Sequence, residues 1–183
     1  MGIHGAFYML LLMTVSLTVY AAAASVNSYN QRIVGGSYTH ISKYPFEVSI
    51  RRKACNICAF EHYCGGVILS ADRILTTSSC VRNAELLYTH VVAGSSYRDN
   101  AAGDGQMYPV EKIIKHEDET IDLALIHLAV PITLGGINAK ASEIAKVTPM
   151  AGTMASVAGW GRREEIGEYS QELNEIHVPI MDL

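Results

Sequence analysis

Short apolar stretches, some of them alternating with polar residues, recur along the chain and predict an all-β fold. In residues 44–50, the side chains of Phe46, Val48 and Ile50 alternate with polar ones, which predicts a strand with these three on one face. A longer apolar stretch at residues 67–75 predicts a further strand. Turns separate such stretches at spacings of roughly 8–12 residues, which is typical of sandwiches and barrels.

The composition supports a folded protein and argues against nucleic acid as a partner. Hydrophobic residues make up 49% of the chain and charged residues 17%, as in proteins that form a core. The 18 acidic residues outnumber the 14 basic ones, so no basic surplus is present to neutralise phosphates. A length of 183 residues fits one domain or part of a larger one.

The first 24 residues have the pattern of a secretory signal peptide. A run without charged residues extends from Ala6 to Tyr20, and small residues at Ala22 and Ala24 fit a signal-peptidase site. The alternative is a transmembrane anchor, but the run is shorter than the roughly 18 apolar residues that a membrane span needs. We therefore expect cleavage near Ala24, a short propeptide at residues 25–32, and a secreted, extracellular protein without a membrane anchor.

The most informative motif is Cys64-Gly65-Gly66, which is followed by the apolar stretch 67–75 and then by Thr76-Thr77-Ser78-Ser79-Cys80. These residues resemble the trypsin-like serine protease family (peptidase S1), in which Thr-Ala-Ala-His-Cys contains the catalytic histidine. In this chain Ser79 replaces that histidine. A serine hydroxyl does not accept the nucleophile's proton near neutral pH as an imidazole does. The resemblance therefore implies a protease homologue that has lost its general base.

Residues Arg32-Ile33-Val34-Gly35-Gly36 resemble the zymogen activation junction of the same family. Taken alone, two glycines after two β-branched residues also form an ordinary turn. Together with the Cys64 motif, the resemblance implies activation cleavage between Arg32 and Ile33. It also implies that residues 33–183 form a trypsin-like protease domain that is incomplete at its C-terminus.

The segment Ile121-Asp122-Leu123-Ala124-Leu125 resembles the family's Asp-Ile-Ala-Leu segment. The family aspartate accepts the imidazole N–H and fixes its tautomer. Asp122 is thus the retained position of the triad. Because Ser79 replaces the histidine, we expect Asp122 to be vestigial and to accept hydrogen bonds only from backbone or hydroxyl groups.

The resemblance to this family also implies the start of a second barrel. Ala158-Gly159-Trp160-Gly161 resembles the strand that opens it, and residues 173–180 predict the next strand. The family's nucleophile motif, Gly-Asp-Ser-Gly-Gly, does not occur in the sequence, and Gly103-Asp104-Gly105-Gln106 predicts only an exposed turn. The predicted fold is a trypsin-like double β-barrel with the first barrel complete and the second truncated. We expect the natural chain to continue past Leu183, since half a barrel leaves an unpaired edge.

The cysteines fit a secreted protein. The resemblance implies a disulfide between Cys64 and Cys80, whereas Cys55 and Cys58 are left open: a local bridge, or pairing with cysteines elsewhere. A zinc site lacks a second pair of ligands at suitable spacing, and a thioredoxin-like motif lacks its βαβ context. We therefore expect no metal and no cofactor. His62 resembles a non-catalytic histidine of the family and is expected to be structural.

Three functions are compatible with the sequence. The first is a secreted pseudoprotease that binds a protein partner without cutting it. The chain is similar to mite inactivated protease paralogues, and this resemblance implies a decoy or inhibitor that binds a component or inhibitor of a proteolytic cascade such as complement. The alternatives are a fragment of a trypsin-like serine endopeptidase, against which Ser79 argues, and a truncated product without a function of its own.

Overall fold

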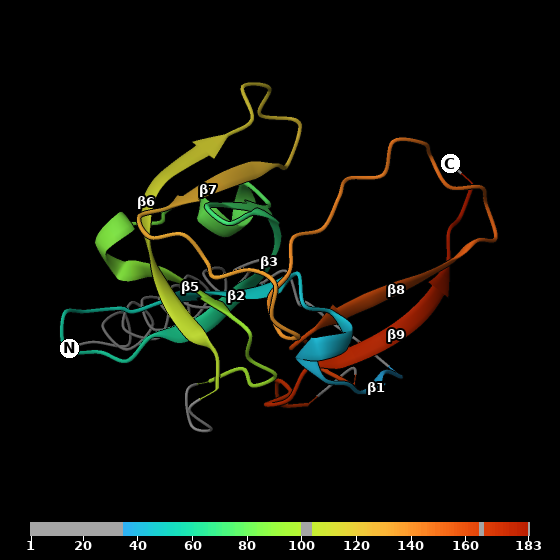
Figure 1. The fold of residues 1–183 in the computed structure, drawn as a ribbon, viewed down its shortest axis with the longest axis horizontal. Coiled ribbons are helices and arrows are strands. Elements are labelled where there is room, and N and C mark those ends of the chain that lie inside the picture. Colours follow the sequence, from blue (N-terminus) through green and yellow to red (C-terminus); the bar gives the residue numbers. More distant parts are fainter. Residues whose placement is uncertain (1–34, 100–103, 165–166, 183) are drawn as a thin grey trace, which may run out of the picture. The chain divides into compact units, whose positions relative to one another are not determined.

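The computed structural model describes residues 35–99, 104–164 and 167–182, all within the compact unit Gln31–Leu183 (Figure 1). The predicted signal peptide, the propeptide and the Arg32–Ile33 junction lie outside the described residues. No helix in the described part of the chain is long and apolar enough to cross a membrane.

Nine strands and three short 3-10 helices make up this part of the chain. In chain order they are β1 (Ser37–Tyr38), η1 (Ile41–Lys43), β2 (Glu47–Arg52), β3 (Glu61–Ser70), β4 (Arg73–Thr76), η2 (Ser79–Val81), η3 (Leu86–Tyr88), β5 (Thr89–Ala93), β6 (Gln106–Lys115), β7 (Ala124–Leu128), β8 (Met154–Gly159) and β9 (Asn174–Pro179).

Six antiparallel strands close into a barrel in the order β2-β3-β4-β7-β6-β5. Its core consists of inward-facing aliphatic side chains, among them Val48, Ile50, Ile68, Ile74 and Ile126, each fully buried. Closure removes the exposed edges that an open sheet would present to another chain. The predicted all-β fold with a complete first barrel is confirmed.

The glycines of the Cys-Gly-Gly motif allow β3 to lie close to its neighbours. A Cβ on Gly66 would lie 2.9 Å from Cγ2 of Ile74 and 3.1 Å from the carbonyl oxygen of Leu75. A Cβ on Gly65 would lie 2.9 Å from Oε1 of Glu47. A larger residue at Gly66 would push β3 away from β4, whereas one at Gly65 would displace the end of the Glu47 side chain.

Two details of the strand predictions are wrong. Residues 67–75 are not one strand: β3 and β4 form a hairpin that turns at Ala71 and Asp72. Phe46 lies outside β2 and packs against a second cluster, instead of sharing the barrel core with Val48 and Ile50. The apolar pattern cannot distinguish one strand from a tight hairpin when turn residues are few.

The second barrel is partial, as predicted. β9 pairs with β8 on one side and with the short β1 on the other, giving a three-stranded sheet. Ile41, Tyr44, Trp160 and Leu173 form its buried cluster. The indole N–H of Trp160 donates to the carbonyl oxygen of Ser96 over 3.0 Å. The contribution of β1 was not predicted, because a two-residue strand has no periodic pattern.

Candidate functional site

Ser79 and Asp122 are brought together by the pairing of β4 with β7. Ser79 begins η2 soon after β4 ends at Thr76, and Asp122 comes just before β7. Thr76 and Ala124, the first residue of β7, are paired across the two strands. The segments that carry Ser79 and Asp122 therefore leave the barrel at the same end.

Ser79 hydrogen-bonds to both oxygens of the Asp122 carboxylate. Its backbone N–H donates to Oδ1 over 2.7 Å, and its hydroxyl donates to Oδ2 over 2.8 Å. Oγ1 of Thr77 lies 3.0 Å from Oγ of Ser79, and Thr77 is the donor because the Ser79 proton already points to the carboxylate. The N–H of Cys80 donates to Thr77 Oγ1 over 3.3 Å. A chain of hydrogen bonds thus runs from Cys80 through Thr77 and Ser79 to Asp122.

These bonds stabilise the ionised form of an exposed carboxylate. The backbone N–H of Ser79, and then its hydroxyl, hold the pKa of Asp122 below its ordinary value of 3.8. The positive charge of Arg82 acts in the same direction with a smaller effect. Asp122 is therefore ionised at neutral pH and has both oxygens engaged.

Within the described residues, the hydrogen bonds to the Asp122 carboxylate come from Ser79 and not from an imidazole. A general base needs a pKa near the operating pH, and a serine hydroxyl is far from it. No histidine in the described part of the chain hydrogen-bonds to Asp122. The catalytic roles predicted for Ser79 and Asp122, one lost and one vestigial, stay predictions, and the geometry is compatible with both.

Of the two disulfides in the described residues, one fixes the segment that carries Ser79. The Cys64–Cys80 bond, with a sequence separation of 16, joins β3 to η2 and so fixes the segment that carries Ser79. The Cys55–Cys58 bond closes a local ring in the loop between β2 and β3, which is one of the two alternatives that the sequence left open. Disulfides of this kind fit an extracellular protein.

A family model described as Trypsin matches residues 33–183. The chain belongs to the trypsin family. A trypsin of Simulium vittatum is 40% identical over 162 residues, which cover 85% of the chain and 63% of that trypsin. Trypsin eta of Drosophila melanogaster is 35% identical over 172 residues, which cover 91% of the chain and 64% of the relative. The chain thus spans less than two thirds of the length of these trypsins.

Solved structures agree with this membership. The crystal structure of the scabies mite inactivated protease paralogue S-D1 matches with a TM-score of 0.70 and 29% identity. The match covers 82% of the chain and 64% of that structure. The trypsin-like fold is therefore shown by the sequence and by the structure.

His62 is half-buried on β3 and hydrogen-bonds to Ser49 of β2, not to Asp122. Nε of Arg51 donates to Oγ of Ser49 over 3.2 Å, and the same oxygen lies 2.7 Å from Nδ1 of His62. Burial, together with the positive charges of Arg98 and Arg51, lowers the pKa of His62 to about 3. The imidazole is therefore neutral at physiological pH.

Glu47, on the same outward face of β2 as Ser49 and Arg51, is a group that sequence reasoning missed. Burial raises the pKa of its carboxyl from 4.5 to about 8. The carboxyl group of Glu47 forms no hydrogen bond or ion pair within the described residues. Alternation places Glu47 opposite to the face of Val48 and Ile50, but its burial depends on what covers that outer face of β2, which the sequence does not show.

Asp104 and Gly105 have a larger role than that of the exposed turn that the sequence predicted for residues 103–106. Oδ1 of Asp104 accepts the hydroxyl of Ser95 over 2.7 Å, and Oδ2 accepts the N–H of Ser96 over 3.0 Å. Gly105 has φ +81, and a Cβ there would lie 2.7 Å from Cβ of Ser95. Asp104 thus fixes the segment whose carbonyl binds Trp160, and it is unrelated to a nucleophile motif.

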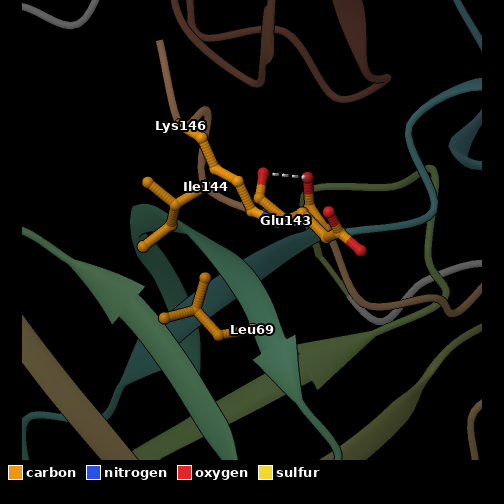
Figure 2. Close-up of a pocket in the computed structure, with 5 residues that line it drawn as sticks. Leu69, Glu143, Ile144 and Lys146 are labelled. Atoms are coloured by element: carbon orange, nitrogen blue, oxygen red, sulfur yellow. Dashed lines mark hydrogen bonds between the residues drawn. The ribbon is translucent and has the colours of Figure 1, made fainter.

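No other described feature adds to the site. Groups of three or more potential metal ligands are absent from the described residues. A depression of about 360 Å³ lies elsewhere on the surface, and β3 and the segment after β7 contribute to it (Figure 2). It is lined by Leu69, Ser142, Glu143, Ile144 and Lys146. Neither Ser79 nor Asp122 lines it, so it is separate from the candidate site.

Proposed function

We propose that the chain is a secreted, proteolytically inactive serine protease homologue that acts by binding a protein partner. The observation that carries the proposal is Ser79, at the position of the family's catalytic histidine, with its amide and hydroxyl on the two oxygens of Asp122. Without an imidazole, the family's mechanism has no proton acceptor.

The size of the defect supports inactivity. Removing a triad member lowers kcat by on the order of 10⁴-fold or more in serine proteases. A serine in its place gives no substitute, because the hydroxyl proton is already directed at Asp122 and the oxygen already accepts from Thr77. A homologue with such a site keeps the surface of a protease without its turnover.

One structural neighbour supports the inactive part of the proposal. This neighbour, 29% identical, is described as an inactivated protease paralogue of the scabies mite. By analogy we propose a decoy or inhibitor that binds a component or an inhibitor of a proteolytic cascade, such as complement. The two disulfides, the signal-like residues 1–24 and the junction Arg32–Ile33 support a secreted protein with a zymogen-like N-terminus.

The alternative is part of an active trypsin-like endopeptidase. The names of the relatives favour it, since the proteins that are 40% and 35% identical are trypsins. The Ser79–Asp122 pair argues against it, because no described histidine takes the place of the missing base.

An active-site probe distinguishes the two functions. The secreted protein would be purified from culture medium, cut at Arg32–Ile33 with immobilised trypsin, and treated with a fluorophosphonate that labels activated serines. We expect no labelling, and no cleavage of fluorogenic arginine or lysine substrates. A full-length trypsin treated in parallel serves as the control. Stoichiometric labelling of the chain would show that the alternative is correct.

A further inference from the structure

The two disulfides differ in how far solvent reaches them. Cys64 and Cys80 belong to the barrel core, with exposed fractions of 5% and 8%. In contrast, Cys58 is exposed and Cys55 half-buried, on the loop that joins β2 to β3 (Figure 1). A thiolate that attacks a disulfide must approach one of its sulfur atoms directly, so access decides which bond reacts. The Cys55–Cys58 bond is therefore open to exchange, and the Cys64–Cys80 bond is shielded.

The accessible bond closes a single turn of the chain. Its two cysteines are separated by three positions in the sequence. The N–H of Cys58 also donates to the carbonyl oxygen of Cys55 over 3.2 Å, which is the hydrogen bond of a β-turn. The turn therefore keeps the two sulfur atoms near each other after the bond is broken. Because such proximity raises their effective concentration, the bond can re-form and the exchange is reversible.

Contacts other than the disulfide attach this loop to the barrel. Oδ1 of Asn56 accepts the hydroxyl of Tyr88 over 3.0 Å, and the N–H of Lys53 donates to the carbonyl oxygen of Tyr88 over 3.1 Å. The ring of Phe60 lies edge-on to that of His90, with 4.2 Å between their centres. Breaking the disulfide leaves these contacts in place, so we expect the barrel to stay folded when the loop is reduced.

A positive charge lies beside the turn. The ammonium group of Lys53 donates to the carbonyl oxygen of Asn56, a residue enclosed by the disulfide, over 3.5 Å. When a disulfide is attacked, one of its sulfur atoms leaves as a thiolate, and a nearby cation stabilises that thiolate. Lys53 is thus placed to favour opening of the bond.

We propose that the Cys55–Cys58 disulfide is a site of thiol–disulfide exchange, at which a low-molecular-weight thiol attacks Sγ of Cys58 and Lys53 stabilises the thiolate that leaves. A bond forms between the attacking sulfur and Cys58, the Cys55–Cys58 bond breaks, and Cys55 leaves as the thiolate. A second thiol then attacks the mixed disulfide and releases Cys58. In total, two thiols are oxidised to one disulfide, and the protein disulfide is reduced to two thiols.

This inference goes beyond the proposed function and does not depend on it. Neither Ser79 nor Asp122 takes part in the exchange, and the Cys64–Cys80 bond that fixes the segment of Ser79 stays oxidised. The site therefore reacts in the same way whether the chain is an inactive homologue or part of an active protease. Fluorophosphonate labelling would refute the proposed inactivity and would leave the exchange unaffected.

Differential alkylation of the folded chain tests the proposal. The purified protein would be incubated with reduced glutathione without denaturant, and samples taken over time would be alkylated with iodoacetamide, digested with trypsin and analysed by mass spectrometry. The tryptic peptide of residues 54–73 carries Cys55, Cys58 and Cys64, and that of residues 74–82 carries Cys80 alone. Fragment spectra therefore assign the label to each cysteine. Near-UV circular dichroism of the same samples monitors the fold.

We expect Cys55 and Cys58 to be labelled at least about tenfold faster than Cys80, with an unchanged circular dichroism spectrum. Lys53→Gln should slow this labelling by about threefold. The matched control is Lys146→Gln, at an exposed position between β7 and β8, which should leave the rate unchanged.

Equal rates of labelling at Cys58 and Cys80 would overturn the proposal. Loss of the circular dichroism signal in step with the labelling would also overturn it, because the thiol would then be reacting with an unfolded chain. A wild-type rate in Lys53→Gln would overturn the role assigned to Lys53.

Discussion

At the scale of single residues, the site is defined by the hydrogen bonds that the Asp122 carboxylate accepts. In the family's triad the aspartate accepts an imidazole N–H. Here the same position, Asp122, accepts the amide and the hydroxyl of Ser79 instead, and these two bonds lower its pKa. The carboxylate has therefore become a cap for the first turn of η2. Its contribution is to stability, and this makes it testable without any substrate.

We predict that Asp122→Ala lowers the melting temperature at neutral pH and that this difference disappears in acid. The pKa of Asp122 is lower in the folded chain than in the unfolded chain, where it is near 3.8. Its carboxylate therefore stabilises the folded state fully at pH values above 3.8, and this contribution is lost as the pH falls through the folded-state pKa. Thermal unfolding of wild type and variant between pH 7 and pH 2 measures the gap. Glu117→Ala, at an exposed position on the same loop, is the control and should show little change at any pH. A constant gap across this range would contradict the prediction.

At the scale of elements, β2 is unusual because both of its faces are covered. Val48 and Ile50 face the barrel core, while Ser49 and Arg51 are buried on the other side. This outer face places Glu47 and the Ser49–His62 pair away from water. One group is kept protonated and the other unprotonated, so folding depends on pH through both.

The two groups act in opposite directions. The depressed pKa of His62 removes stability as the pH falls from 6.5 towards about 3, because the unfolded chain then binds a proton that the folded chain does not. The raised pKa of Glu47 removes stability as the pH rises from 4.5 towards about 8. Between 4.5 and 6.5 the two slopes oppose each other, so the stability from this pair is greatest there and changes little.

We predict that Glu47→Gln stabilises the protein at pH 8 and has little effect at pH 4.5. The amide keeps the shape of the neutral carboxyl but has no proton to lose, so it removes a penalty that grows by about 1.4 kcal/mol per pH unit. Urea denaturation at both pH values measures the free energy of unfolding. Glu143→Gln, at an exposed site, is the control. A stabilisation that is equal at the two pH values would refute this account.

The two disulfides close loops of different length, and we predict that they differ in their contribution to stability. In the loop-entropy description, closing the 16-residue separation of Cys64–Cys80 contributes about 3 kcal/mol, and the three-residue separation of Cys55–Cys58 about 2 kcal/mol. Double serine variants of each pair, compared by urea denaturation, measure the difference. A larger loss of unfolding free energy on removing Cys55–Cys58 would contradict this prediction. It would mean that this disulfide also stabilises residues outside the loop that it closes.

At the scale of the whole molecule, the sequence was most informative where a motif has a steric reason. Gly66 lies against Ile74 at the pairing of β3 with β4, and the Cys64–Cys80 bond that the family resemblance implied is present, although the stretch 67–75 is a hairpin and not one strand. The sequence was least informative about side chains whose contacts are with residues far away along the chain. Nothing in the sequence near Asp104 indicates that its carboxylate accepts hydrogen bonds from Ser95 and Ser96.

Two further features were not predicted, because they also depend on contacts between distant parts of the chain. The burial of Glu47 depends on what covers β2, and β1 exists only because Ser37 and Tyr38 meet β9 late in the chain. The candidate site was predictable because Ser79 and Asp122 lie in recognisable segments. What the sequence did not show is that both oxygens of Asp122 bind one residue.

The whole molecule also decides what a repaired site could do. Ser79→His would restore a base on the first barrel, where Asp122 is in place to orient it. Catalysis needs in addition a nucleophile and an oxyanion hole, which is worth about 10²–10³ in kcat, and the 183-residue sequence contains no Gly-Asp-Ser-Gly-Gly motif to supply them.

We therefore predict that Ser79→His in the 183-residue chain gives no activity above that of wild type, even after cleavage at Arg32–Ile33. Each protein would be treated with immobilised trypsin and assayed with a fluorogenic arginine substrate and a fluorophosphonate probe. The matched control is the reverse change in the full-length Simulium vittatum trypsin, where replacing the catalytic histidine by serine should lower kcat/KM by about 10⁴-fold. Probe labelling of the Ser79→His chain would reveal a nucleophilic serine outside the family's motif, because the new histidine must then have found a hydroxyl to activate.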